Sequence, residues 1–187
     1  MTVVIIFGPA SVGKMTVGQK LCEITGYKLL HNHMTIDSLT PIFEFGSDPY
    51  CTLVSEFRFR ILEEASKSDL KGLVHTFIWG FYDSDDTDFM RRVKTTVEAN
   101  GARICFVELK ASLETRKARA VTENRKKHKP GNVERGTKHL EEYERGRKHN
   151  SGGDFPFSEN YLFIENEKFS AEGAAEIICK HFDLVRS

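Results

Sequence analysis

Glycines and a lysine near the start of the chain have the spacing of a phosphate-binding loop. The stretch matches the first seven positions of the pattern G-x-x-x-x-G-K-S/T and comprises Gly8, Pro9, Ala10, Ser11, Val12, Gly13 and Lys14. Backbone N–H groups of such a loop form a nest for anions, and the helix that begins there adds the positive end of its dipole. Lys14 would reach the β- and γ-phosphates of a nucleotide. The spacing predicts ATP binding; the simpler alternative is a glycine-rich turn with an incidental lysine.

One position departs from this pattern. Met15 follows Lys14 where serine or threonine normally places a hydroxyl on Mg²⁺. A thioether is a poor ligand for such a hard cation. We therefore expect either that Thr16, the nearest hydroxyl, substitutes, or that water, substrate and carboxylates hold the metal. Phosphate binding is unaffected, because it depends on the backbone and Lys14.

Polar side chains also follow the second predicted strand. His31, Asn32 and His33 come directly after it, and Asp37 lies a few residues further on. Ligands of open α/β sheets lie beyond the carboxyl ends of the strands, so these residues are candidates for binding a second substrate. His31 or His33 could act as a general base or bind substrate, whereas a metal site would need a third ligand that the sequence does not show. Asp37 could equally cap a helix that begins near Ser38.

Apolar strands and amphipathic helices alternate along the chain and would position both clusters. The run 3–7 is β-branched and aromatic throughout, as in a central parallel strand buried on both faces. The alternation predicts an α/β fold with right-handed crossovers and helices on both faces of the sheet. The expected strands are 3–7, 27–30, 73–79, 104–109 and 161–164. The expected helices are 14–25, about 50–68, 86–99 and 112–126, a piece around 134–148, and a last helix capped by Ser170. The residues of helix 50–68 expected to face the core are Val54, Phe57, Ile61 and Ala65.

Positive charge is concentrated between residues 110 and 149. This stretch has 13 Lys+Arg and six Glu, a net charge of +7 in a chain whose net charge is zero. Phosphoryl transfer needs positive charge over a transition state whose charge is spread over oxygens, and a basic lid would supply it. A solvated basic surface and a nucleic-acid patch are the alternatives. Tyr143 is the only aromatic residue in the stretch, which leaves little for base stacking.

The loop and the order of the elements resemble the P-loop small-molecule kinases: shikimate kinase, gluconate kinase and the chloramphenicol phosphotransferases. The resemblance implies a three-layer P-loop NTPase fold with a five-stranded parallel sheet in the order 2-3-1-4-5. It also implies ATP as donor and a mobile basic lid, here at about 112–153. It extends over most of the chain as element order, whereas only the loop is a specific match.

The resemblance further implies roles for single residues. The stretch 36–39 is similar to the Asp-Ser-Leu run of the chloramphenicol phosphotransferases, which implies that Asp37 is the base for the acceptor hydroxyl. The Asp-x-Asp of shikimate kinases and the Asp-Gly-Asp of gluconate kinases are missing, which argues against those two substrates. The residues implied to contact the nucleotide are Arg116 and Asn166, and those implied to close over the transferring group are Arg119 and Arg125.

Two further groups of residues have a structural and a functional interpretation. Four aspartates lie between residues 83 and 88, where we expect them to cap a helix, with a role in binding metal or substrate as the alternative. Aromatic residues near the second and third strands could line an acceptor pocket, although core packing is expected for most of them. They are Phe43, Phe45, Trp79, Phe81 and Tyr82.

Composition excludes several broad classes. The 187 residues carry 27 Lys+Arg and 27 Asp+Glu, so attraction to nucleic acid or a membrane has no basis in the net charge. No apolar run approaches the ~18 residues that span a bilayer. The four cysteines form no Cys-x-x-Cys and are expected to be reduced. We expect one cytoplasmic domain over residues 1–187.

These patterns favour an ATP-dependent phosphotransferase that uses Mg²⁺ and acts on a hydroxyl of a small molecule. The alternative is a regulatory or degenerate protein that binds ATP without transferring phosphate, which Met15 favours. A third possibility is a polynucleotide or nucleoside kinase that uses the basic stretch.

Overall fold

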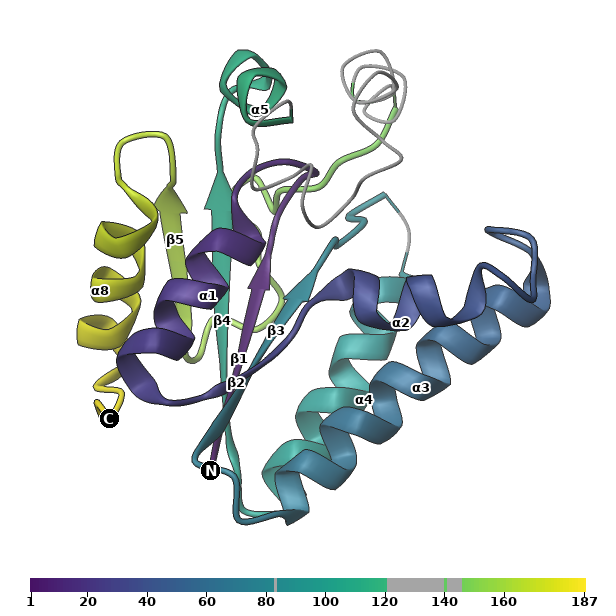
Figure 1. Cartoon of the computed structure of the whole chain (residues 1–187), viewed down its shortest axis with the longest axis horizontal. Coiled ribbons are helices and arrows are strands. Elements are labelled where there is room, and N and C mark those ends of the chain that lie inside the picture. Colours follow the sequence, from purple (N-terminus) through teal and green to yellow (C-terminus); the bar gives the residue numbers. More distant parts are fainter. Residues whose placement is uncertain (83, 121–139, 141–145) are drawn as a thin grey trace.

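A five-stranded parallel sheet forms the centre of the molecule (Figure 1). The computed structural model describes residues 1–82, 84–120, 140 and 146–187. The strands are β1 (Thr2–Phe7), β2 (Lys28–Leu30), β3 (Gly72–Phe77), β4 (Arg103–Lys110) and β5 (Tyr161–Glu165). Their order is β2-β3-β1-β4-β5, which confirms the predicted topology.

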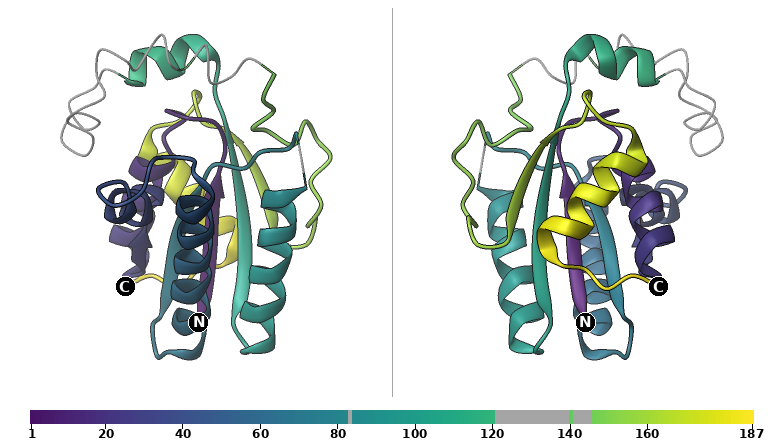
Figure 2. Two further views of the ribbon diagram at one scale, coloured as in Figure 1. Left: turned by 90° about the vertical axis from the view of Figure 1, so that its right-hand side faces the viewer. Right: turned by 90° about the vertical axis from the view of Figure 1, so that its left-hand side faces the viewer.

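Helices cover both faces of the sheet. They are α1 (Lys14–Thr25), α2 (Asn32–Leu39), α3 (Asp48–Lys67), α4 (Asp85–Ala99), α5 (Leu113–Ala120) and α8 (Ala171–Phe182). Figure 2 shows α1 and α8 on one side of the sheet and α4 on the other. Among the described helices, none has the length and apolar character needed to cross a membrane.

Side chains of β1 alternate between two cores. Val4 and Ile6 pack with residues of α1 and α8, whereas Val3, Ile5 and Phe7 pack with residues of α3 and α4. All five side chains are fully buried, because helices cover both faces of a central parallel strand. Burial of this kind stabilises a fold by about 25 cal/mol per Å² of apolar surface and fixes the level of the strand in the sheet.

The strand register brings the loops of the carboxyl edge together. Phe7 at the end of β1 pairs with Phe77 at the end of β3 and with Glu108 near the end of β4. The segments that follow β1 and β3 therefore leave the sheet at one level, and β4 continues for two residues beyond it. Ligands of open parallel sheets are bound at this edge.

A buried carboxylate below this edge ties the segment after residue 146 to the sheet. Glu108 is fully buried and accepts hydrogen bonds from Asn150 Nδ2 (2.8 Å), Ser151 N (2.9 Å), Ser151 Oγ (2.7 Å) and Tyr161 OH (2.7 Å). Burial, together with the bond to Glu108, raises the pKa of Tyr161. Because the buried oxygens have several donors, the carboxylate is stabilised without a cation at hydrogen-bond distance among the described residues.

Helix α2 differs from the expectation. One alternative for Asp37 is a cap on a helix that begins near Ser38, whereas α2 already begins at Asn32 and ends at Leu39. Asp37 therefore lies within the helix, and the prediction that it is an N-cap is wrong. A tertiary bond sets the earlier start, because Asn32 N donates to Thr76 Oγ1 of β3 at 3.0 Å.

Two other details are corrected. Phe57 of α3 is 45% exposed, and the helix instead buries Tyr50, Val54, Phe59 and Leu62. Strand β3 ends at Phe77 rather than at residue 79, although Trp79 is still fully buried in the aromatic core. Residues 121–139 and 141–145, which include most of the predicted lid and of the helical piece 134–148, lie outside the described residues.

His75 of β3 should make the stability of the protein depend on pH. It is fully buried, and Nδ1 lies 2.9 Å from the carbonyl oxygen of Leu30, which can only accept, so Nδ1 carries the proton. Burial, reinforced by the charge of Arg58, lowers the pKa of His75 to about 3. The folded state therefore resists protonation that the unfolded state accepts below its ordinary pKa of about 6.5.

We predict that the free energy of unfolding falls as the pH is lowered from about 6.5 toward 3, by up to ~1.4 kcal/mol per pH unit from this residue. Urea unfolding between pH 7.5 and pH 4 measures the fall. In His75→Asn, which keeps a donor but does not titrate, the dependence should be shallower. Parallel curves for the two proteins would show that His75 does not titrate as argued.

Candidate functional site

The loop between β1 and α1 has the backbone of an anion nest. Gly8, Ser11 and Gly13 have φ angles of 136°, 62° and 108°. A Cβ on Gly8 would lie 2.3 Å from the carbonyl oxygen of Leu109, and one on Gly13 would lie 2.7 Å from Asn166 Nδ2. Glycine is therefore required at both positions by close packing as well as by conformation.

Lys14 begins α1 at the mouth of this loop. Its Nζ donates to the carbonyl oxygens of Gly8 and Pro9, each at 2.7 Å. The ammonium group thus folds back over the loop, at the N-terminal end of a helix of 12 residues. Lysine and helix dipole place positive charge at the same point, which favours an anion there.

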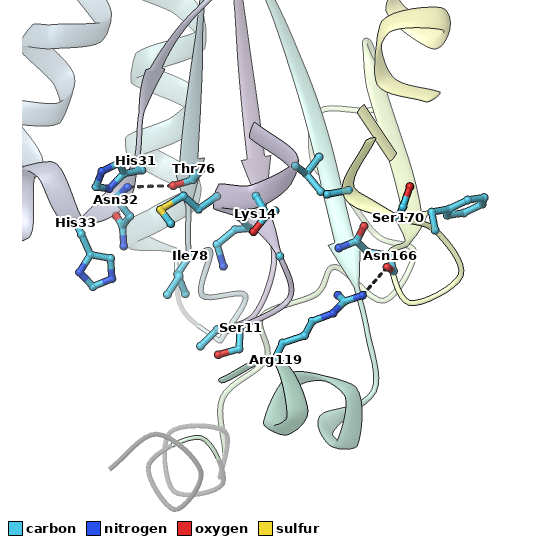
Figure 3. Close-up of a pocket in the computed structure, with 17 residues that line it drawn as sticks. Ser11, Lys14, His31, Asn32, His33, Thr76, Ile78, Arg119, Asn166 and Ser170 are labelled. Atoms are coloured by element: carbon cyan, nitrogen blue, oxygen red, sulfur yellow. Dashed lines mark hydrogen bonds between the residues drawn. The ribbon is translucent and has the colours of Figure 1, made fainter. Parts of the chain in front are cut away.

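A cavity of about 470 Å³ extends from the loop to both sides of α1 (Figure 3). This volume is in the range of small-molecule sites. Its floor is the loop and the first turn of α1, formed by Ala10, Ser11, Gly13, Lys14, Met15, Thr16 and Val17. One wall consists of Arg119, Asn166, Phe169, Ser170 and Ala171, and the opposite wall of His31, Asn32, His33, Thr76 and Ile78.

Arg119 and Asn166 join the loop to the start of α8. Arg119 Nη1 donates to the carbonyl oxygen of Val12 at 2.8 Å, and its Nη2 donates to that of Asn166 at 3.0 Å. Asn166 Nδ2 donates to the carbonyl oxygen of Val12 at 2.6 Å. Its Oδ1 is buried with no hydrogen-bond partner among the described residues, which is costly unless a ligand supplies a donor.

Arg116 lies behind the loop rather than in the cavity. It is almost completely buried, and it donates from Nε to the carbonyl oxygen of Ala111 at 3.2 Å and from Nη1 to that of Ala10 at 3.4 Å. Its guanidinium supports the outer part of the loop and does not line the cavity. Arg125 falls outside the described residues.

The predicted second-substrate residues are only partly brought together. His31, Asn32 and His33 line the cavity, and Figure 3 shows all three on the side away from Arg119 and Asn166. Asp37 does not line it, and its side chain is 64% exposed. The carboxylate Oδ1 of Asp37 lies 3.5 Å from Nδ1 of His33, one helical turn earlier in α2.

Met15 and Thr16 both line the cavity. The hydroxyl-bearing residue expected to substitute for the missing serine or threonine, Thr16, is therefore part of the site. The lining residues include no carboxylate, and no group of three or more His, Cys, Asp or Glu that could hold a metal occurs in the described part of the chain. Of the aspartates at 83–88, Asp85, Asp86 and Asp88 lie in the first turn of α4, where their charge suits the helix dipole, but the N-cap is Ser84 and no side chain makes a cap hydrogen bond there. Asp86 Oδ2 instead accepts from Gly80 N, before the helix, at 2.7 Å. Asp83 is not described.

Sequence analysis missed several lining residues. The sequence predicts Thr76 and Ile78 only as strand residues, although they lie at the carboxyl end of β3, where ligands of open parallel sheets bind. Phe169 precedes the confirmed N-cap Ser170, whose side chain accepts from Gly173 N, and no sequence signal marked it. Of the candidate aromatic residues, none lines the cavity; Trp79 is in the core and Phe45 and Tyr82 are exposed.

Comparisons with known proteins give the fold its context. No protein-family model matches the sequence, and no curated protein is similar to it. Among solved structures, the tunicamycin resistance protein of Deinococcus radiodurans is similar over 100% of this chain and 98% of its own, with a TM-score of 0.61 and 20% identity. The shikimate kinase of Acinetobacter baumannii, solved with shikimate, is similar over 97% and 92%, with a TM-score of 0.55 and 19% identity. A gluconokinase of Sinorhizobium meliloti is similar over 97% and 96%, with a TM-score of 0.51 and 13% identity.

The chain has the fold of the P-loop small-molecule kinases. The five-stranded order and the loop after β1 fit this fold. With sequence identities of 13% to 20%, these similarities identify the fold but not the activity, which depends on the residues of the site.

The packing of Gly8 allows a direct test of the loop. We predict that Gly8→Ala lowers the free energy of unfolding by about 3 kcal/mol or more. An added Cβ would lie 2.3 Å from the backbone of β4, and alanine would also have to adopt the unfavourable φ of 136°. Gly101→Ala is the matched control, since Gly101 has a φ of 76° but nothing within 4 Å of an added Cβ. It should cost about 1 kcal/mol. Equal losses in urea unfolding would mean that close packing at Gly8 is unimportant.

Proposed function

We propose that the protein transfers the γ-phosphate of ATP to a hydroxyl group of a small molecule. The observation that carries this proposal is the single cavity in which the loop and Lys14 lie between two different walls. One wall offers cationic and amide groups, and the other offers two histidines and an asparagine. A donor and an acceptor could therefore meet above Lys14, as an in-line transfer requires.

The donor half fits a nucleoside triphosphate. The nest at Gly8–Gly13 offers backbone N–H groups to phosphate oxygens, and glycine leaves room for them to approach. Lys14 would exchange two carbonyl partners for the phosphates, which attract its charge more strongly. The buried Oδ1 of Asn166 offers an acceptor to a base beside Phe169 and Arg119.

Positive charge favours the transfer itself. The transition state spreads negative charge over the oxygens of the moving phosphoryl group, and fixed cations stabilise it. Lys14 supplies such a cation from the floor of the cavity, and Arg119 supplies another from one wall. Arg125 is proposed to add a third from the basic segment.

Mg²⁺ would be held chiefly by the phosphate oxygens of the nucleotide, with Thr16 as the protein ligand. The hydroxyl of Thr16 suits this cation, whereas the thioether of Met15 beside it does not. Bound in this way, Mg²⁺ would neutralise charge on the phosphates. With no carboxylate among the described lining residues, the protein contribution to the metal is small.

The acceptor half would hold a small hydroxyl compound against His31, Asn32 and His33. Asn32 is anchored through its backbone to Thr76, and its side-chain Oδ1 is buried with no hydrogen-bond partner among the described residues. A donor on the acceptor molecule, such as a second hydroxyl, would satisfy this atom. We therefore favour a polyhydroxylated acceptor, within the space that remains beside a triphosphate.

One alternative function is binding of ATP without transfer of phosphate. Met15 supports it, because a thioether stands where the motif has a hydroxyl for Mg²⁺. Release of ADP, measured with and without Mg²⁺ over a panel of sugars, shikimate-like acids and nucleosides, separates the two. Stimulation by an acceptor supports the kinase. Tight ATP binding with no turnover under any of these conditions supports a regulatory protein.

We predict that Lys14→Ala reduces ATP affinity at least tenfold or abolishes transfer, because it removes the charge above the loop. Isothermal titration and ADP release measure the two effects. Lys20→Ala is the control, since Lys20 lies on the same helix but pairs with Glu23 at the surface. Unchanged affinity and activity in Lys14→Ala would remove the central assignment.

The two residues after Lys14 give a separate prediction about Mg²⁺. Thr16→Val preserves shape but removes the hydroxyl, so we expect the Mg²⁺ concentration for half-maximal activity to rise about tenfold. Met15→Ser adds a hydroxyl at the position of the motif and should lower that concentration. A Mg²⁺ requirement that neither variant alters would show that the protein contributes no ligand here.

A further inference from the structure

Helix α2 carries a histidine–aspartate pair at the rim of the cavity. His33 Nδ1 and Asp37 Oδ1 are 3.5 Å apart, and their spacing of four residues places them on one face of the helix. His33 lines the cavity and its side chain is 26% exposed, whereas Asp37 lies outside the lining and is 64% exposed. A hydroxyl bound in the cavity would therefore meet the imidazole before the carboxylate.

We propose that His33 takes the proton of the acceptor hydroxyl and that Asp37 is a positioning residue acting through it. This inference rests on the proposed function and deepens it. It differs from the role of direct base that the resemblance implies for Asp37. The cavity lining, which includes His33 and not Asp37, favours His33, because a general base must come within hydrogen-bond reach of the proton that it removes.

The pairing determines which nitrogen is the base. An ionised carboxylate can only accept, so the nitrogen facing Asp37, Nδ1, carries the hydrogen. The lone pair of a neutral His33 is then on Nε2. The separation of 3.5 Å is long for a hydrogen bond, and such contacts shorten once the imidazole becomes positively charged.

Positive charges near His33 oppose its protonation, and Asp37 would offset them. The other charged or titratable groups that line the cavity are Lys14, His31 and Arg119, of which the lysine and arginine disfavour a second cation nearby. From α3, Arg58 Nε donates to Thr35 Oγ1 of α2 at 3.0 Å. Burial raises the pKa of Tyr50, also in α3, and the charge of Asp37 makes a smaller contribution in the same direction. Asp37 is the anion paired with His33, and it would stabilise the imidazolium against these cations.

The step balances without any further reactant. The acceptor oxygen forms a bond to the γ-phosphorus, and the bond from that phosphorus to the β,γ-bridging oxygen breaks. The electron pair of the broken bond leaves with ADP. The hydroxyl proton passes to Nε2 of His33 and is later released to water.

Nitrogen-15 NMR of the histidine side chains tests the pairing without any acceptor. With His33→Gln to assign the signal, we expect neutral His33 of the wild-type protein to carry its hydrogen on Nδ1. In Asp37→Asn, His33 should lose a proton at a pH about 0.5–1 unit lower, because the neighbouring negative charge is gone. A wild-type His33 with its hydrogen on Nε2, or a titration that Asp37→Asn leaves unchanged, overturns the inference.

Kinetics with whichever acceptor stimulates ADP release tests the catalytic step. We expect His33→Gln to lower kcat about 10²-fold or more with little change in the KM for ATP, and Asp37→Asn to lower it less while moving the acidic limb of the pH profile to lower pH. His181→Gln, at the exposed end of α8, is the control and should behave as the wild type.

The outcomes separate the two proposals. If the wild type turns over but His33→Gln retains its rate, or if Asp37→Asn is the more damaging change, Asp37 acts directly and the inference fails alone. If no acceptor stimulates ADP release, the proposed function fails, and the role of His33 as a base fails with it.

Discussion

The close approach of Gly8 to β4 is the constraint on which the site depends. Only hydrogen can occupy the space next to the carbonyl oxygen of Leu109, which an added Cβ would approach to 2.3 Å. The chain can therefore turn off the sheet immediately after β1, at the level where β3 also ends and two residues before the end of β4. The same turn places Lys14 at the head of α1 and brings Ala10, Ser11 and Gly13 of the loop to the floor of the cavity. Strand register, loop and helix dipole thus act at one point, which is how open parallel sheets bind anions.

Charge is distributed so that this edge of the sheet favours anions. The described residues that line the cavity include Lys14 and Arg119 but no Asp or Glu. Nearby carboxylates are engaged elsewhere: Glu108 is buried below the loop among neutral donors, and Asp86 accepts from the backbone of Gly80. Glu108 has hydrogen-bond donors at both of its oxygens, so it fixes the segment at Asn150 and Ser151 and leaves the positive charge of the cavity available for phosphate.

Strands and the phosphate loop could be predicted from the sequence because their signals are local. The run at 3–7 is apolar at every position, and the loop has fixed glycine spacing. Helix α2 could not be bounded in this way, because its first residue is set by a bond to Thr76, 44 residues away. The position of Asp37 relative to the cavity depends on that start. Likewise, nothing local distinguishes Arg116 from Arg119, yet packing buries the first behind the loop and places the second in the cavity.

The proposed donor and acceptor halves of the site differ in how firmly the fold holds them. The donor half is built on the central strand, whose side chains are completely buried, and Arg119 and Asn166 both bond to the loop at Val12. The acceptor half depends on α2, which has eight residues and would be marginal in isolation. Hydrogen bonds of Asn32 N to Thr76 and of Arg58 to Thr35 hold it to β3 and α3. Local opening is easier where a segment has few buried contacts. We therefore expect α2 to be the part that adjusts when an acceptor binds, and changes in α2 to alter acceptor selectivity while the phosphate loop remains as it is.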